Sequence, residues 1–128
     1  QERELVVISP SASDIELRNV SDYLFRTIPS SEIGDEILNN KDYRILSKDS
    51  EEFREAYRNA YNVQPGAFAS QSYDAANALI GIIKKGITSG RDIKNELYGV
   101  QFEGASGVIS FDSQGDLLAK YDVFEKRS

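Results

Sequence analysis

The chain has 128 residues, a hydrophobic share of 40% and a charged share of 28%, which suits one globular domain and is too short for two. Its formal net charge of −6 argues against a nucleic-acid backbone as partner. The absence of Cys and His excludes disulfides, thiol nucleophiles and zinc-thiolate sites, and it removes the commonest general base. We therefore expect neither enzymatic activity nor a cofactor.

The N-terminal part of the chain predicts two short strands. Leu5 to Ile8 is a continuous apolar run that ends at Ser-Pro, which is typical of a buried strand. Tyr23 to Ile28 is a second strand candidate, stopped by Pro29. A short helix is expected from Glu32 to about Asn39, with Ser30-Ser31 before it as a cap.

Three longer helices are predicted in the middle of the chain. The first covers Asp49 to Tyr61, with Asp49 and Glu52 at capping-box spacing and an apolar face behind them. The second runs from about Ser72 to Lys85 and is apolar around most of its surface, so burial on more than one side is expected. The third runs from Arg91 to about Tyr98 and is capped by Ser89.

In the C-terminal part of the chain, the spacing of apolar residues changes from a helical period to a period of two residues. Gly107 to Phe111 leads into a turn at Asp112 to Asp116, and alternate residues from Leu117 to Phe124 are apolar, which predicts a hairpin. The turn lacks the ligand spacing of a calcium loop, so no metal site is expected. The glycine-rich run Gly104 to Gly107 has no following Lys, which indicates a bend and not a phosphate-binding loop.

Two segments suggest ligand binding, each with a plain alternative. The loop from Ile8 to Asp14 is made of small residues, so its backbone N–H groups and the Ser13 hydroxyl can approach an anion, aided by a short helix from Ile15 to Arg18. It can equally be an ordinary connection between two elements. A group of aromatic residues around a Pro-Gly turn either packs in the core or lines the mouth of a pocket: Tyr57, Tyr61, Phe68 and Tyr73.

Three segments in succession resemble the type I periplasmic solute-binding proteins, in their branched-chain amino-acid-binding branch. VVISPSASDIELRNVSDYLFRTIPSS resembles the segment that ends a strand of the first lobe and crosses toward the second. EEFREAYRNAYNVQPGAFASQSYDAANALIGIIKK resembles the later first-lobe helices. FEGASGVISFDSQGD resembles the stretch that crosses back. The three motifs keep the order that they have in the family.

The resemblance implies an α/β fold of the periplasmic-binding-protein type I kind, with a three-layer αβα lobe, in a partial or internally shortened copy. It divides the single domain 1–128 into a first-lobe strand, ligand loop and crossover (1–31), a shortened junction (32–47), first-lobe helices (48–106) and a terminal hairpin (107–128). Family members have two lobes that close on a small polar ligand like a Venus flytrap, and they catalyse no reaction.

The same resemblance implies a role in transport. It predicts extracytoplasmic binding of a small polar solute, an amino acid or a related amide, by the substrate-binding component of an ABC-type importer. The partner would be the membrane permease, and the location would be periplasmic or extracellular, with a lipid anchor on the full-length parent. The alternative is a structural, interaction or sensor domain without a working pocket, which self-associates or binds a partner fragment through exposed strand edges.

The ligand-binding residues are also implied by the resemblance. Family members hold the α-carboxylate of the ligand with the loop that matches Ser11, Ala12 and Ser13, through backbone N–H groups and a hydroxyl at Ser13. The region from Phe68 to Tyr73 lies near the cleft in the family. We therefore expect Phe68 and Tyr73 to be further ligand contacts.

Overall fold

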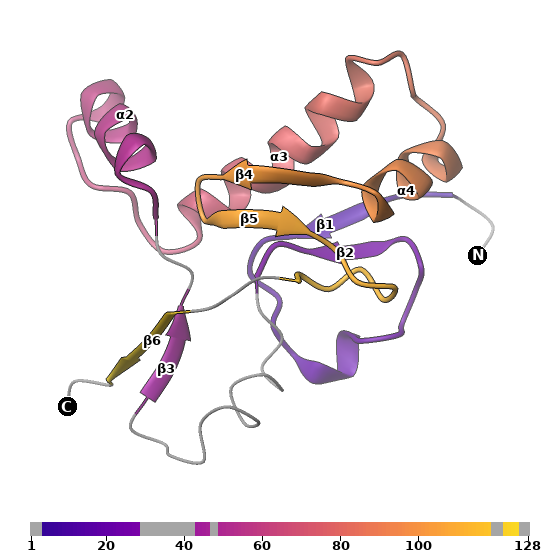
Figure 1. Ribbon diagram of the computed structural model, residues 1–128, viewed down its shortest axis with the longest axis horizontal. Helices are drawn as coiled ribbons and strands as arrows, with labels where there is room; N and C mark the ends of the chain where they lie inside the picture. Colours follow the sequence, from indigo (N-terminus) through magenta and orange to yellow (C-terminus); the bar gives the residue numbers. More distant parts are fainter. Residues whose placement is uncertain (1–3, 29–42, 47–48, 119–121, 126–128) are drawn as a thin grey trace.

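The computed structural model of the chain describes residues 4–28, 43–46, 49–118 and 122–125, so the helix expected between residues 32 and 39 lies outside the described residues. Figure 1 shows the elements in chain order. These are β1 (Val7–Ser9), the 3₁₀ helix η1 (Ile15–Leu17), β2 (Leu24–Arg26), β3 (Tyr43–Leu46), α2 (Glu51–Tyr61), α3 (Ala69–Ile83), α4 (Gly90–Tyr98), β4 (Gln101–Gly104), β5 (Gly107–Ser110) and β6 (Asp122–Glu125).

The strands of the described residues pair into three small sheets. β1 and β2 are parallel, with Val7 opposite Leu24, so both strands predicted near the N-terminus form. The predicted burial of the first strand is wrong, because β1 lies at the edge of a two-stranded sheet and Leu5 and Val7 are exposed. β4 pairs with β5, and β3 pairs with β6, both antiparallel. Parallel pairs need a long connection between their strands, and here residues 10–23 with η1 provide it.

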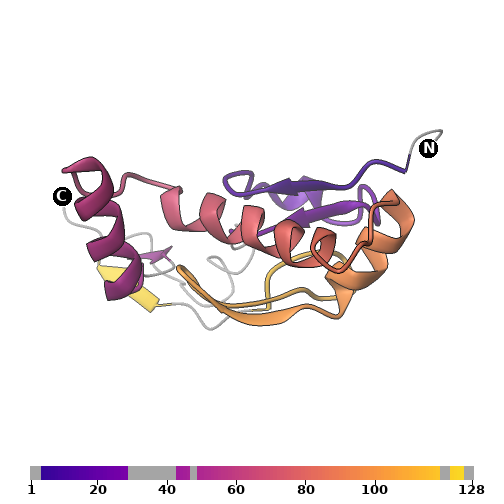
Figure 2. The same ribbon diagram turned by 90° about the horizontal axis from the view of Figure 1, so that it is seen from above.

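Helix α3 is the centre of the packing. It lies between the β1–β2 pair and the β4–β5 hairpin, and α4 packs near its carboxyl end (Figure 2). The core takes its side chains from β2, α3, α4, β5 and the segment that follows β5, namely Phe25, Ala78, Ile82, Leu97, Ile109, Phe111 and Leu117. The predicted burial of α3 on several sides is wrong for Ile80 and Ile83, which are exposed, because the described elements flank only part of the helix.

The helix starts follow local capping. The Oγ of Ser50 accepts the N–H of Phe53 at 3.2 Å and caps α2, so the predicted cap at Asp49 is wrong by one residue. Asp49 instead accepts a 2.5 Å hydrogen bond from the Ser70 hydroxyl, which links the start of α2 to the start of α3. Ser89 caps α4 as predicted, and its Oγ accepts the N–H of Asp92.

The predicted terminal hairpin of residues 107–128 is wrong in its pairing. β5 pairs with β4, a strand absent from the prediction, and the expected bend at Gly104 to Gly107 is the turn between them. The turn from Asp112 to Asp116 does form, with the N–H of Asp112 donating to the Asp116 carbonyl at 2.8 Å. Beyond it, a bridge joins Phe111 and Leu117, and the N–H of Leu118 donates to the Ser110 carbonyl at 2.8 Å, so the described part of the hairpin is short. β6 pairs with β3.

A buried carboxylate joins α3 to the β4–β5 turn. Asp74 is 0% exposed and accepts hydrogen bonds from the N–H of Ala105 at 2.6 Å, the N–H of Ser106 at 2.8 Å and the Ser106 hydroxyl at 2.5 Å. Gly104 packs on the same carboxylate, and a Cβ at that position would lie 2.5 Å from its Oδ2 atom. The position of the hairpin therefore depends on Asp74 and on the bare backbone at Gly104.

Replacing Asp74 by Ala leaves two buried backbone N–H groups without an acceptor. We expect the free energy of unfolding to fall by about 3 kcal/mol, the scale of a lost charged acceptor together with unsatisfied donors. Urea unfolding followed by circular dichroism measures this. Glu55→Ala, at an exposed position of α2, is the control and should change stability by less than about 0.5 kcal/mol. Equal effects of the two variants would contradict the structural role of Asp74.

Candidate functional site

The loop of residues 10–14 lies at the carboxyl edge of the parallel β1–β2 pair. The N–H of Thr27 donates to the Ser9 carbonyl at 3.1 Å, and the Thr27 hydroxyl donates to the Gln71 carbonyl at 2.8 Å. Gln71 lies one helical turn after Phe68, at the start of α3. The strand ends and the first turn of α3 therefore meet at one edge of the molecule (Figure 2).

Arg26 holds this loop from inside the protein. Its side chain is 1% exposed. Nε donates to Oδ1 of Asp116 at 2.6 Å, and Nη1 donates to the carbonyls of Asp14 at 2.8 Å and Ala12 at 3.3 Å. Since Arg26 comes from β2, one guanidinium ties β2 to both the loop and the turn that carries Asp116.

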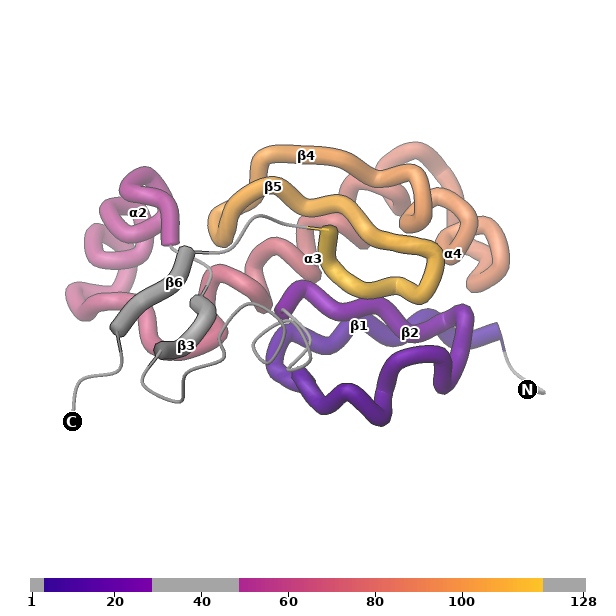
Figure 3. The backbone as a smooth tube through the Cα atoms, turned by 60° about the horizontal axis from the view of Figure 1, so that its bottom comes forward, coloured from indigo at the N-terminus to yellow at the C-terminus, as the bar shows by residue number. Residues whose placement is uncertain are grey.

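The backbone of β2 contacts the same turn. The N–H of Arg26 donates to the Gly115 carbonyl at 2.9 Å, and Figure 3 shows residues 111–117 lying beside β2. Gly115 has φ 79°, and a Cβ there would lie 2.0 Å from the Leu24 carbonyl oxygen. Only glycine permits both this conformation and this approach. The turn therefore covers the edge of β2 that faces away from β1.

The hydrogen bonds to Arg26 set the direction of the loop amides. In a trans peptide the C=O and the following N–H point in opposite directions, and the described chain has no cis peptide. Because the Ala12 carbonyl points inward to Arg26, the N–H of Ser13 points away from Arg26. The N–H of Ala12 is occupied, since it donates to the Ser9 hydroxyl at 3.1 Å. Among the described residues, neither Ser11 nor Ser13 has a hydrogen-bond partner for its N–H or hydroxyl.

The helix expected after the loop is shorter than predicted. η1 is a single 3₁₀ turn, Ile15–Leu17, where a helix from Ile15 to Arg18 was expected. The Asp14 carboxylate accepts the N–H of Glu16 at 2.9 Å. That amide is therefore used within the turn and does not add to an anion site, so the donors available for a ligand come from the loop itself.

Phe68 precedes α3 in a backbone conformation that is rare for a bulky residue. Its φ of 64° lies in the left-handed region, and it makes no side-chain cap for the helix. The ring is 45% exposed. An aromatic residue in this conformation is strained, and such strain is concentrated at ligand sites and switch regions. Phe68 is thus an exposed ring just before α3, one turn ahead of Gln71, whose carbonyl bonds to Thr27.

Tyr73 lies on a different face of α3. The Thr27 hydroxyl donates to the backbone carbonyl of Gln71, whereas the Tyr73 side chain, rotated by about 200° from that of Gln71, faces α2. Its ring packs 5.2 Å from that of Phe53. The structure therefore brings Ser11, Ala12 and Ser13 toward the edge where α3 begins, and it places Tyr73 in a separate groove.

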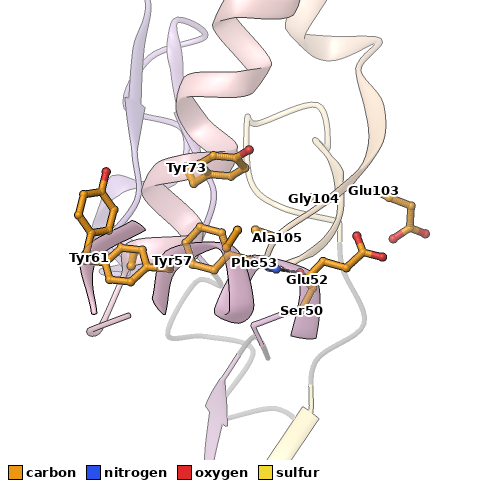
Figure 4. Close-up of a pocket in the computed structure, with 11 residues that line it drawn as sticks. Ser50, Glu52, Phe53, Tyr57, Tyr61, Tyr73, Glu103, Gly104 and Ala105 are labelled. Atoms are coloured by element: carbon orange, nitrogen blue, oxygen red, sulfur yellow. Dashed lines mark hydrogen bonds between the residues drawn. The ribbon is translucent and has the colours of Figure 1, made fainter. Parts of the chain in front are cut away.

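That groove of about 580 Å³ lies between α2, the start of α3 and the β4–β5 hairpin. Figure 4 shows Phe53, Tyr57, Tyr61 and Tyr73 along it, with two glutamates at its other end. Of the four aromatic residues expected either in the core or at the mouth of a pocket, Tyr57, Tyr61 and Tyr73 line this groove, and Phe68 does not. Its lining residues are Ser50, Glu52, Phe53, Ala56, Tyr57, Tyr61, Ala69, Tyr73, Glu103, Gly104 and Ala105.

Polar contacts also attach α4 to the segment before β2. Nζ of Lys94 donates to the Asp22 carboxylate at 2.8 Å, and the Tyr98 hydroxyl donates to the Asp22 carbonyl at 2.8 Å. The hydrogen bond from Lys94 lowers the pKa of Asp22, while burial, more than any charge, raises the pKa of the Tyr98 phenol. Because Lys94 and Asp22 form a solvent-exposed pair, they contribute orientation more than stability.

The described ranges contain no group of three acidic side chains arranged to hold a metal ion. Within the same ranges, no helix has both the length and the apolar character needed to cross a bilayer. Sequence reasoning missed Arg26, Thr27 and Asp116 as parts of the site. One signal was present, because Arg26 is a charged residue inside the apolar strand pattern Tyr23 to Ile28, and a charge in a buried strand needs a partner.

Known proteins resemble the chain in sequence and in fold. The model of the family described as "Receptor family ligand binding region" matches residues 32–127. No curated protein sequence matches the chain. The predicted type I periplasmic binding fold, in a partial copy, is confirmed by this match together with the solved structures that the chain resembles.

Three solved structures are similar to the chain. An extracellular ligand binding receptor from Desulfohalobium retbaense has 22% identity over 80% of this chain, with a TM-score of 0.58. An ABC transporter substrate-binding protein from Desulfitobacterium hafniense, in complex with Leu, has 13% identity over 97% and a TM-score of 0.78. A branched-chain amino acid transporter substrate binding protein from Streptococcus pneumoniae, in complex with isoleucine, has 27% identity over 65% and a TM-score of 0.55.

The chain is short relative to two of these proteins. It spans 20% of the D. retbaense chain and 26% of the S. pneumoniae chain, but 71% of the D. hafniense chain. The shared fold therefore concerns one part of the larger proteins.

Replacing Arg26 by Met removes the 2.6 Å partner of the buried Asp116 carboxylate and leaves it the longer ion pair with Arg18, at 3.8 Å. We expect a loss of about 3–5 kcal/mol in the free energy of unfolding, measured by urea denaturation. The double variant Arg26→Met/Asp116→Asn should lose less than the sum of the single changes, by at least about 1 kcal/mol. Arg58→Met, at an exposed position of α2, is the matched control. If Arg26→Met cost no more than that control, the loop would not depend on the buried pair.

Proposed function

Because the chain belongs to the family of receptor ligand-binding regions, we propose that it binds a small amino acid through the loop Ser11–Ser13 and catalyses no reaction. The observation that carries the proposal is that Ser13 has two unused hydrogen-bond donors. Its N–H points away from Arg26, and both its N–H and its hydroxyl lack a partner among the described residues. Two neighbouring donors of this kind suit the two oxygens of a carboxylate.

The surroundings of Ser13 support an anionic group at this place. Arg26 keeps the loop in one conformation, so little ordering is required when a ligand binds. Its guanidinium also puts a positive charge behind the loop, although Asp116 balances that charge. The hydroxyl of Ser11 is exposed and offers a further donor. Ala12 contributes through its carbonyl bond to Arg26 and through its small side chain, which keeps the approach open.

The side chain of the ligand is assigned to Phe68. This ring is exposed near the same edge, and its strained backbone fits a position retained for contact and not for packing. An apolar amino acid would bury part of the ring, and the D. hafniense and S. pneumoniae relatives are complexes with Leu and isoleucine. Tyr73, the other aromatic contact expected from the resemblance, is not assigned to this site, because its ring packs against Phe53 of α2 in the separate groove.

The wider role follows from the relatives. Two of the similar structures are substrate-binding proteins of transporters, and the third is an extracellular ligand binding receptor. We assign to this chain the same kind of task, namely solute capture in the periplasm or outside the cell, with an ABC-type permease as the membrane partner.

An interaction domain without a working pocket is the second candidate. In the parallel register, the backbone groups of Val7 and Ser9 face β2, and those of Ile8 face away from it. No described strand pairs with that outer edge of β1, where Leu5 and Val7 are also exposed. Open strand edges of this kind favour association with another strand. Light scattering separates the two functions: a stable dimer that leucine leaves unchanged favours the interaction domain.

The binding proposal predicts the effect of Ser13→Ala. Loss of one hydrogen bond to a charged group should weaken L-leucine binding by about 1–2 kcal/mol, or about 5- to 30-fold, in isothermal titration calorimetry. Ser113→Ala, an exposed serine in the turn after β5, should bind as the unchanged protein does. Unaltered affinity in Ser13→Ala would remove Ser13 from the site. Absence of binding heat with L-leucine, and with other amino acids and amides, would remove the proposed function.

A further inference from the structure

We propose that the groove between α2, α3 and the β4–β5 hairpin binds an organic cation with a quaternary or methylated ammonium group, at a site separate from the Ser11–Ser13 loop. The separation follows from α3, whose Gln71 carbonyl accepts a hydrogen bond from Thr27 of the β1–β2 side while its Tyr73 side chain packs against Phe53 of α2. The two sites therefore lie on different faces of one helix, and a ligand in one does not occupy the other.

A continuous row of aromatic rings runs along the groove. Tyr61 and Tyr57 lie 4.8 Å apart, Tyr57 and Phe53 lie 5.9 Å apart, and Phe53 and Tyr73 lie 5.2 Å apart, between ring centroids. Core aromatics would be covered, but Tyr61 is 66% exposed and Tyr73 is 53% exposed, and α2 has no buried residue. The faces of such rings are electronegative and attract cations, best of all poorly hydrated ones such as quaternary ammonium groups.

The groove also carries negative charge. Glu52 of α2 and Glu103 of β4 line it at the end away from Tyr61 (Figure 4). Neither carboxylate has an ion pair or hydrogen bond within the described part of the chain, and no Lys or Arg is among the lining residues. The nearby Arg54 does not neutralise them, because its Nη2 pairs with Glu51 at 3.2 Å.

Two further groups affect the potential in the groove. Asp74 lies buried against Gly104, which forms part of the groove wall, and its carboxylate adds negative potential. The amino ends of α2 and α3 both border the groove, and each opposes the carboxylates with the equivalent of about half a positive charge. Two carboxylates at the groove and a third behind its wall outweigh these two dipoles, so the charge of the groove favours a cation over an anion.

Size and composition select an organic cation over a metal ion. The volume of about 580 Å³ lies in the range of small-molecule sites, roughly 300–1,000 Å³. Calcium and magnesium require six or more oxygen ligands close together, whereas two glutamates on separate elements face a row of aromatic carbons here. A methylated ammonium group uses both features, since its methyl groups contact the rings while its charge faces the carboxylates.

Choline and its neutral carbon isostere 3,3-dimethylbutan-1-ol test this assignment, because the two molecules share a shape and differ in charge. We expect saturable binding of choline, followed by tyrosine fluorescence and by NMR of the tyrosine rings, with the isostere at least about tenfold weaker. Glu52→Gln/Glu103→Gln should lower choline affinity at least about tenfold and remove the preference for charge. Tyr73→Leu should weaken choline as well, because it removes one ring face.

The matched controls keep this result apart from amino-acid binding. Glu55→Gln, an exposed carboxylate of α2 outside the groove, should leave choline affinity unchanged, and so should Ser13→Ala. Equal affinity for choline and the isostere, no saturable choline binding up to millimolar concentration, or unchanged affinity in Glu52→Gln/Glu103→Gln would each overturn the proposal. Failure of leucine to bind, with choline binding intact, would refute only the amino-acid function.

Discussion

The buried ion pair between Arg26 and Asp116 is the interaction on which the loop site depends. A guanidinium that is 1% exposed is costly to remove from water, and a partner at 2.6 Å with two carbonyl acceptors offsets that cost. The geometry of these bonds turns the Ala12 carbonyl inward and the Ser13 N–H outward. A charge that serves no ligand directly therefore decides which donors a ligand can reach.

Helix α3 contacts three other elements, because successive residues of a helix project in different directions. Within one turn, it presents Gln71 to Thr27, Tyr73 to Phe53 and Asp74 to the β4–β5 turn. These three contacts join the helix to β2, to α2 and to the hairpin. The residues of α3 that belong to the apolar core, Ala78 and Ile82, follow these contacts along the helix. A groove of about 580 Å³ lies beside α2, and the proposed loop site lies at the strand ends.

Features that depend on neighbouring residues, such as helices and caps, were predicted well from the sequence. Strand pairings between distant segments were not. The apolar run before Ser9, the amphipathic period of α2 and the Ser89 cap of α4 act over a few residues, so they are readable from the chain. β4 was missed because Gln101 to Gly104 contains one large apolar residue and a glycine. The pairing of β6 with β3 joins distant segments, which strand periodicity cannot specify, and so the terminal hairpin was assigned to the nearer partner.

The same distinction applies to the site. The loop Ser11–Ser13 could be proposed as a site because small residues after a strand are visible in the sequence, and the family resemblance pointed to the same place. Arg26 and Thr27 were missed because their roles exist only through Asp116 and Gln71, which lie far along the chain. The aromatic residues were identified, but their division between Phe68 at the loop edge and Tyr73 in the groove depends on the rotation of α3.

The most direct test of the loop as a carboxylate site is an NMR titration of the ¹⁵N-labelled chain with L-leucine. The account predicts that the amide resonance of Ser13 moves saturably, together with those of Ser11 and Phe68, while the amides of α2 stay in place. A spectrum in which leucine moves no loop amide, or moves only residues around the aromatic groove, would contradict it.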